Sequence, residues 1–267
     1  MRRLLFLRGK LKGFFFLLHG HRFFSSHLFS FVGSMSALSK WIQQHKKLGH
    51  NDFYSFKFDY ARREQLFEHV IRQEGLDAAI DYLEFGVYTG SSFCHSIRCC
   101  KYTEKLNPKV LNTKFYGFDS FSGFGEISEE DKHPFYTDSN FDTSFENVNN
   151  RVKKISKGGN FKLIKGFFNE SLKKGANSIG ISKSRIIFID SDTYSSAQEA
   201  LEFCIPTLQL GTFIILDDFF SYKGSLDKGV SKAFYEFINI AKVEVRDIFT
   251  YGMGGKVFVV SKCNYNL

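Results

Sequence analysis

Acidic residues that follow two apolar runs are the side chains best placed to do chemistry. Asp190 and Asp192 follow Ile-Ile-Phe-Ile, and Asp217 and Asp218 follow Phe-Ile-Ile-Leu. Such runs are typical of buried strands in a parallel sheet, and ligands of open α/β sheets bind at the carboxyl ends of the strands. Four carboxylates in one crevice repel one another unless a cation lies among them or one is protonated. The sequence therefore predicts a site for a hard divalent cation.

A turn that contains two glycines, and an aspartate after another apolar run, suggest a ligand in addition to the cation. Gly86 and Gly90 follow an apolar segment, where they allow a tight turn, a close ligand approach and a helix amino terminus. Many strand-to-helix turns use two glycines, and the absence of GxGxxG disfavours a nicotinamide site. Asp119 ends the next apolar run. There its carboxylate can accept hydrogen bonds from both hydroxyls of a ribose, or it can cap a helix. The combination favours nucleoside binding.

The elements that must position these residues alternate along the chain. Apolar periodicity predicts a helix over 62–73 that ends at Gly75. Runs with strand character and mostly helical segments between them predict a doubly wound, mostly parallel α/β sheet of the Rossmann-like kind. A Gly-rich turn near the end predicts an antiparallel hairpin. The expected strands are 82–86, 114–119, 161–164, 185–190, 212–217, 243–250 and 256–261.

Charge divides the chain into two expected domains. Residues 1–51 hold nine of the 36 basic residues and no acidic one, which leaves 27 basic against 28 acidic residues in 52–267. A nearly neutral body argues against a nucleic-acid surface. The five cysteines lack CxxC spacing, so neither a disulfide framework nor a zinc site is expected.

The basic, Phe-rich extension 1–51 has no apolar run near the roughly 20 residues that span a bilayer. Three interpretations compete: a segment at an anionic membrane surface, a cleaved targeting peptide, and an extension that packs on the body or on a partner chain. We favour the surface contact and the extension over cleavage. The expected location is cytoplasmic, with peripheral membrane contact or homo-oligomer formation through this segment.

Four blocks of sequence together resemble the macrocin O-methyltransferase family. They occur in the family's order within roughly residues 60–262, and they are jointly specific although each alone is not. The resemblance implies a class I, S-adenosylmethionine-dependent, metal-assisted enzyme that methylates sugar hydroxyls of natural products. The blocks are 82–90, 115–126, 189–196 and 217–224.

The resemblance also implies roles for individual residues. Metal ligands would be Asp190, Asp217 and Asp218, with Mg²⁺ or another divalent cation, and Asp192 would be the general base or would orient a bound water. His133, in a polar insertion, would contact the acceptor, or it is a solvated loop histidine. Cofactor contacts would come from Glu84, Gly86, Tyr88, Gly90, Asp119, Ser120, Phe121, Gly166, Phe167 and Asp190.

Physical chemistry supports this assignment of roles. A sugar hydroxyl is a weak acid, so methyl transfer gains from a cation at the oxygen, a carboxylate that accepts the proton and a near-attack geometry. We therefore expect an O-methyltransferase with a small hydroxylated acceptor, such as a sugar or glycosylated metabolite. The alternatives are a non-catalytic nucleotide- or sugar-binding module and a metal-dependent phosphoryl-transfer enzyme. Clustered carboxylates disfavour the first, and a missing GxxxxGK[ST] loop disfavours the second.

Overall fold

The fold is known from a computed structural model, which describes the body of the chain. The predicted extension 1–51 and Gly75 lie outside the described residues. Among the described residues, none of the helices has the length and apolar character needed to cross a membrane. The described ranges are 63–74, 81–106, 113–136, 141–252 and 254–263.

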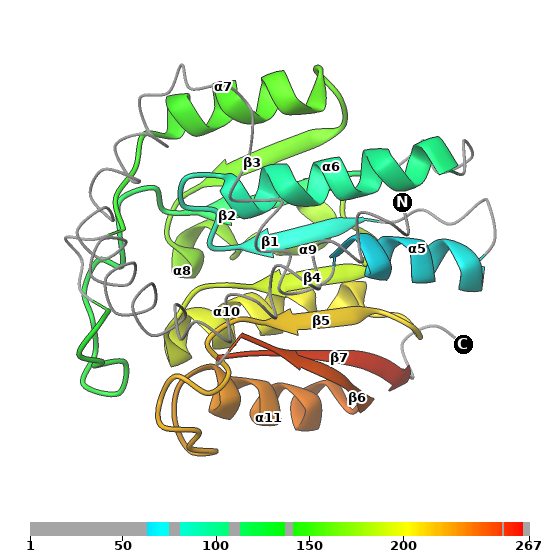
Figure 1. Cartoon of the computed structure of the whole chain (residues 1–267). Coiled ribbons are helices and arrows are strands. Elements are labelled where there is room, and N and C mark those ends of the chain that lie inside the picture. The colour runs from blue at the N-terminus through cyan, green and yellow to red at the C-terminus, as the bar shows by residue number, and fades with distance from the viewer. Residues whose placement is uncertain (1–62, 75–80, 107–112, 137–140, 253, 264–267) are drawn as a thin grey trace, which may run out of the picture. The chain divides into compact units, whose positions relative to one another are not determined.

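The described residues form one seven-stranded sheet with the order β3-β2-β1-β4-β5-β7-β6 (Figure 1). Strands β1 to β5 are parallel, and β7 pairs antiparallel with both β5 and β6. The strands are β1 (Tyr82–Phe85), β2 (Phe115–Asp119), β3 (Phe161–Lys165), β4 (Ile186–Ile189), β5 (Phe213–Leu216), β6 (Glu244–Tyr251) and β7 (Gly255–Lys262).

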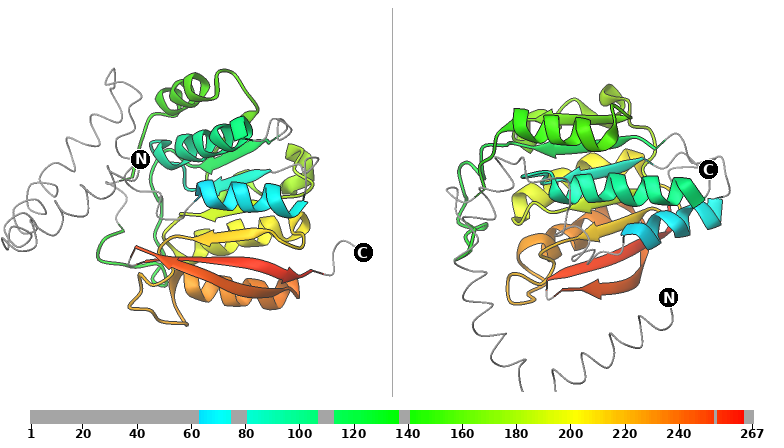
Figure 2. Two further views of the ribbon diagram at one scale, coloured as in Figure 1. Left: turned by 45° about the vertical axis from the view of Figure 1, so that its right-hand side comes forward. Right: turned by 45° about the horizontal axis from the view of Figure 1, so that its top comes forward.

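Helices cover both faces of the sheet, as Figures 1 and 2 show. One face has α5, α6 and α7, and the other has α8 to α11. The predicted helix 62–73 is observed as α5. The bounds are α5 (Arg63–Glu74), α6 (Ser91–Leu106), α7 (Phe145–Ser156), α8 (Phe168–Ser171), α9 (Gly175–Ile179), α10 (Tyr194–Cys204) and α11 (Gly229–Ala241).

Each face of the sheet has its own apolar core, because successive side chains of a strand point to opposite faces. On β1, Leu83 and Phe85 pack with α10 and α11, whereas Tyr82 packs with α5 and α6. Strands β4 and β5 are buried along their whole length, as expected for parallel strands covered on both faces. The predicted doubly wound sheet with a C-terminal hairpin is confirmed.

The order in which strands are added to the sheet reverses between β1 and β4, which are parallel neighbours. After β1 the strand order runs outward through β2 to β3, and after β4 it runs the other way through β5. Loops at the carboxyl ends therefore diverge at this point and leave room for ligands. The segments after β1, β2, β4 and β5 hold the residues that the sequence singled out.

Gly86 is the point where two of these loops touch. It has φ +93°, and a Cβ atom there would lie 1.7 Å from the carbonyl oxygen of Asp190. The backbone nitrogens on either side also bind the sheet: Gly86 donates to Phe118 O (2.9 Å) and Asp190 to Phe85 O (2.8 Å). The loops after β1 and β4 can come this close because residue 86 has no side chain.

We expect Gly86→Ala to lower the free energy of unfolding by roughly 3 kcal/mol or more, since a left-handed alanine costs about 1–2 kcal/mol and overpacking adds about 1–3 kcal/mol. Gly158→Ala is the matched control, because Gly158 has φ +75° and no atom within 4 Å of the added Cβ. It should cost about 1 kcal/mol. Urea unfolding measures both, and equal losses would contradict the predicted clash.

Candidate active site

A cavity of about 170 Å³ lies at the carboxyl ends of the central strands. Side chains and backbone from the loops after β1, β2, β3 and β4 converge on it, so its position matches the reversal of strand order. The lining residues are Gly86, Tyr88, Asp119, Ser120, Gly123, Phe124, Phe141, Phe167, Phe168, Asp190, Ser191, Asp192 and Ser196.

Asp119 is held in place by backbone donors. Its carboxylate accepts hydrogen bonds from the backbone N–H groups of Tyr88 (2.7 Å) and Phe121 (2.5 Å). Burial raises the pKa of Asp119, and the N–H groups of Tyr88, Phe121 and Val87 oppose that rise. The result is a fixed acceptor at the cavity wall, which is what a pair of vicinal hydroxyls requires.

Aromatic rings form an apolar side of the cavity. The rings of Phe124 and Phe141 lie edge to face with centroids 4.9 Å apart, and Tyr88 is 5.9 Å from Phe141. Phe167, which is 38% exposed, packs against Gly125, where a Cβ would lie 3.0 Å from the ring. Flat apolar walls of this kind suit a purine base.

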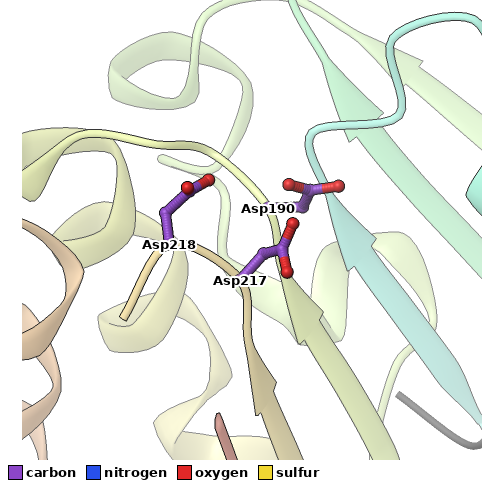
Figure 3. A group of neighbouring side chains, drawn as sticks. All are labelled: Asp190, Asp217 and Asp218. Carbon is purple, nitrogen blue, oxygen red and sulfur yellow. The ribbon is translucent and has the colours of Figure 1, made fainter. Parts of the chain in front are cut away.

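Three aspartates come together beside the cavity (Figure 3). Oxygen atoms of Asp190, Asp217 and Asp218 all lie within 4.8 Å of one another. Backbone bonds fix two of them at adjacent strand ends, because Asp190 N donates to Phe85 O (2.8 Å) and Asp217 N donates to Ile189 O (2.9 Å). The convergence predicted from the two apolar runs is therefore observed.

Repulsion among the carboxylates of this cluster could be relieved by a bound cation. Burial raises the pKa of Asp190, and the carboxylates of Asp217, Asp192 and Asp218 raise it further. The pKa of Asp217 is also raised, first by burial and then by Asp218. A divalent cation removes this penalty, and carboxylate oxygens are the ligands that Mg²⁺ prefers. The donor set fits such an ion.

Asp192 lies within reach of the same cluster. Burial raises its pKa, and Asp218, with which it shares a hydrogen bond, raises the pKa further. Asp192 (φ +64°) and Asp218 (φ +50°) both have left-handed backbone, as do Tyr88 and Phe121 on the neighbouring loops. Strained conformations of non-glycine residues gather at functional sites. A carboxylate with a raised pKa is also the stronger proton acceptor.

Glu84 lies behind the cavity and does not line it. Two-residue periodicity directs it, like Tyr82, to the face covered by α5 and α6, and the Tyr82 hydroxyl donates to Glu84 Oε2. Burial raises the pKa of Glu84 to about 7, against the opposing effect of Arg63. Arg63 donates to Ser92 Oγ (2.8 Å) and lies 4.3 Å above the Phe188 ring. Glu84 thus supports the base of the glycine turn.

His133 has protein partners at both ring nitrogens. Its Nδ1 accepts from the backbone N–H of Phe135 (3.2 Å), and its Nε2 lies 3.3 Å from the carbonyl oxygen of Ser221. These partners assign the proton of a neutral ring to Nε2. The ring is also stacked on Tyr136, with centroids 4.3 Å apart. In this geometry His133 can take a proton from a substrate hydroxyl only after the contact between Phe135 N–H and Nδ1 is broken.

The cofactor contacts implied by sequence fall into two groups. Gly86, Tyr88, Asp119, Ser120, Phe167 and Asp190 line the cavity, whereas Glu84, Gly90, Phe121 and Gly166 do not.

Residues outside the lining still shape the loops that form it. The ring of Phe121 packs on Phe145 at 5.1 Å, and Gly166 donates from its N–H to Asp119 O (3.0 Å). Sequence reasoning gave no role to Phe124, although it lies in the block 115–126, or to Phe141, which a chain with 33 phenylalanines does not distinguish.

Comparison with known proteins decides what kind of domain this is. A family model described as a methyltransferase domain matches residues 83–219, from β1 to the end of β5 and the Asp217–Asp218 pair. The chain belongs to this methyltransferase family. The prediction that it is a methyltransferase, made from the four sequence blocks, is confirmed. No curated protein matches the sequence.

Solved structures agree with the methyltransferase fold. The O-methyltransferase NovP is 18% identical with a TM-score of 0.61, over 76% of this chain and 79% of that one. CalS11, a calicheamicin methyltransferase, is 16% identical with a TM-score of 0.58, over 85% and 91% of the two chains. This methyltransferase therefore has the class I fold.

Glu84→Gln should reveal the raised pKa as a pH-dependent stability difference. Because the pKa of Glu84 rises from 4.5 to about 7 on folding, its contribution to stability is full below pH 4.5 and is lost as the pH rises toward 7. Relative to the variant, the wild type should lose roughly 3 kcal/mol across that window.

Urea unfolding at pH 4.5 and 7.5 gives the measurement. The control is Glu170→Gln, at an exposed glutamate of α8. A wild-type-to-variant difference that stays constant with pH would show that Glu84 titrates normally.

Proposed function

We propose that this methyltransferase transfers a methyl group from S-adenosylmethionine to a hydroxyl of a sugar or glycosylated metabolite, with a divalent cation such as Mg²⁺. The observation that carries the proposal is that the cavity and the carboxylate cluster share one edge. Asp190 and Asp192 line the cavity, and Asp190 also belongs to the cluster with Asp217 and Asp218. A methyl donor in the cavity would therefore lie next to groups that activate a hydroxyl.

The cavity offers complementary groups for the donor. Asp119 would accept hydrogen bonds from the two ribose hydroxyls. Such charge-assisted hydrogen bonds are about twice as strong as neutral ones. The rings of Phe124, Phe141 and Phe167 would contact the adenine. Gly86 lines the cavity and would offer its backbone to the methionine part, while the place of its missing side chain is taken by the Asp190 carbonyl.

The aspartates would divide the chemistry between them. Asp190, Asp217 and Asp218 would hold the cation, which supplies Lewis acidity at the hydroxyl oxygen. Asp192 would accept the hydroxyl proton as the oxygen forms its bond to the methyl carbon and the carbon–sulfur bond breaks. The products are a methyl ether and S-adenosylhomocysteine, with the proton on Asp192. The surrounding protein holds the reacting atoms at near-attack distance.

Sugar hydroxyls are the acceptors that fit this arrangement. An alcohol needs both a Lewis acid and a base near neutral pH, and the cluster with Asp192 offers both. NovP is described as an O-methyltransferase and CalS11 as a TDP-rhamnose 3'-O-methyltransferase. The fold shared with CalS11 supports a sugar as the acceptor here.

Asp119→Ala should weaken the binding of S-adenosylhomocysteine at least about tenfold, because charge-assisted hydrogen bonds contribute about 1.5–3 kcal/mol. Isothermal titration calorimetry measures the affinity. Asp227→Ala, at an exposed aspartate after β5, is the control and should bind as the wild type does. Unchanged affinity in Asp119→Ala would remove Asp119 from the cofactor site.

Asp217→Asn and Asp192→Asn should separate metal binding from proton transfer. Asp217→Asn should abolish the binding of Mn²⁺, a spectroscopic substitute for Mg²⁺, whereas Asp192→Asn should bind it nearly as the wild type does. With TDP-rhamnose as a trial acceptor, Asp192→Asn should lower turnover by roughly 10²–10⁴. Mn²⁺ titration followed by electron paramagnetic resonance and a methyl-transfer assay give the two readouts.

Equal loss of Mn²⁺ affinity in both variants would make Asp192 a ligand. Full turnover in excess chelator would end the metal proposal. These two outcomes concern the metal and the base. The cofactor site is tested separately by the Asp119 variant.

A further inference from the structure

A segment between β2 and α7, residues 127–136, contains a buried aspartate that the proposed chemistry does not use. Asp131 is 3% exposed, and we refer to residues 127–136 as the docking segment. Its carboxylate accepts three hydrogen bonds: from Ser128 Oγ (2.9 Å), from the backbone N–H of Ser195 (3.1 Å) and from Ser195 Oγ. Ser195 lies in the first turn of α10, so Asp131 attaches the docking segment to that helix.

The backbone of the docking segment attaches it to a second place, the turn after β5. The hydroxyl of Tyr222 donates to the carbonyl oxygen of Asp131 over 2.9 Å, within the protein interior. Two residues further on, His133 Nε2 donates to the carbonyl oxygen of Ser221 (3.3 Å). One short stretch of chain thus bonds both to α10 and to the turn at 221–222.

The second attachment leads directly to the carboxylate cluster. Ser221 Oγ donates to Asp218 Oδ1 (2.6 Å), and Ser221 N donates to the carbonyl oxygen of Asp218 (3.0 Å). A displacement of Ser221 therefore changes the orientation of the Asp218 carboxylate. The first attachment leads to the other side of the site, because α10 begins two residues after Asp192.

Aromatic packing stiffens the connection. His133 stacks on Tyr136 at 4.3 Å and meets Tyr222 edge to face at 5.0 Å. Tyr136 is 4% exposed, and burial raises its pKa, with the carboxylates of Asp218 and Asp192 acting in the same direction. The rings thus fill the space between the docking segment and the rim of the site.

We propose that Asp131 is a positioning residue that holds the Asp192 side and the Asp217–Asp218 side of the site at a fixed separation. The loops after β4 and β5 belong to different βα units, and the docking segment bridges them. The proposal rests on the proposed function, since it assigns Asp131 to the geometry of that same cation site. It does not depend on which hydroxylated acceptor is used.

A simple helix cap would act differently. Thr193 already caps α10, because its side chain accepts from Ser196 N. If Asp131 only added to that cap, its loss would affect the first turn of α10 and nothing beyond it. A positioning role extends the effect to the turn at 218–224, which has no direct hydrogen bond to the Asp131 side chain in the described structure.

Hydrogen exchange of the metal-free, full-length protein separates these cases. In Asp131→Ala, the backbone amides of 218–224 should exchange at least about tenfold faster, together with those of the first turn of α10. Glu129→Ala is the matched control: it removes an exposed acid of the docking segment that pairs with Lys132 at the surface, and it should exchange as the wild type does. Asp131→Asn keeps an oxygen that can accept from Ser195 N–H, so it should restore part of the protection.

Metal and cofactor titrations complete the test. Mn²⁺ affinity should fall in Asp131→Ala, by at most the roughly 10–100-fold seen when a direct partner of a metal ligand is lost, because Asp131 acts through Ser221 and Tyr222. S-adenosylhomocysteine affinity should stay within about twofold of wild type. Tyr222→Phe, which deletes the bond to the Asp131 carbonyl, should reproduce the faster exchange at 218–224. It also serves as the second variant if Asp131→Ala does not fold.

Unchanged exchange at 218–224 in the folded Asp131 and Tyr222 variants would overturn the proposal. Faster exchange confined to α10 would overturn it equally, because that is the result for a helix cap. If the wild type itself bound no Mn²⁺, the metal part of the proposed function would fail, and the exchange comparison would still decide the role of Asp131.

Discussion

Burial of several carboxylates at one edge of the sheet is the constraint on which the site depends. Asp190, Asp192 and Asp217 all have raised pKa values, with burial as the first cause and neighbouring carboxylates adding to it. Water is a better solvent for these anions than the protein interior, so the fold must hold them there against their own repulsion. The parallel strands, their two covering layers and the docking segment provide that restraint.

Much of the fold could be predicted because the sequence pattern is local. The apolar runs before Asp190 and Asp217 fit short buried strands, and backbone direction then brings their carboxyl ends together. All seven expected strands are observed, with ends that differ by at most one residue. The C-terminal hairpin could be predicted from its glycine-rich turn, because turn-forming residues are also a local signal.

The site was predicted less completely, because side-chain direction and long-range contact are not local properties. Glu84 precedes the glycine turn, yet strand periodicity turns it away from the cavity toward Arg63. Phe124 lies in the block 115–126 but was given no role, and nothing in the sequence neighbourhood of Phe141 marks it, although both line the cavity. His133 was expected either to contact the acceptor or to be a solvated loop histidine. The structure gives both of its ring nitrogens protein partners, and a contact with the acceptor stays a prediction. Residues 1–51 lie outside the described structure, so their separate role stays a prediction.

The contact of Gly86 with the Asp190 carbonyl has a consequence for redesign of the enzyme. Position 86 cannot be remodelled by substitution, since any side chain there would push apart the loops after β1 and β4 that line the cavity. The rings of Phe124, Phe141 and Phe167 also line the cavity and lie outside the strands, so their packing can change without moving a strand end. Selection for altered donor analogues would therefore succeed through those phenylalanines and leave position 86 as glycine.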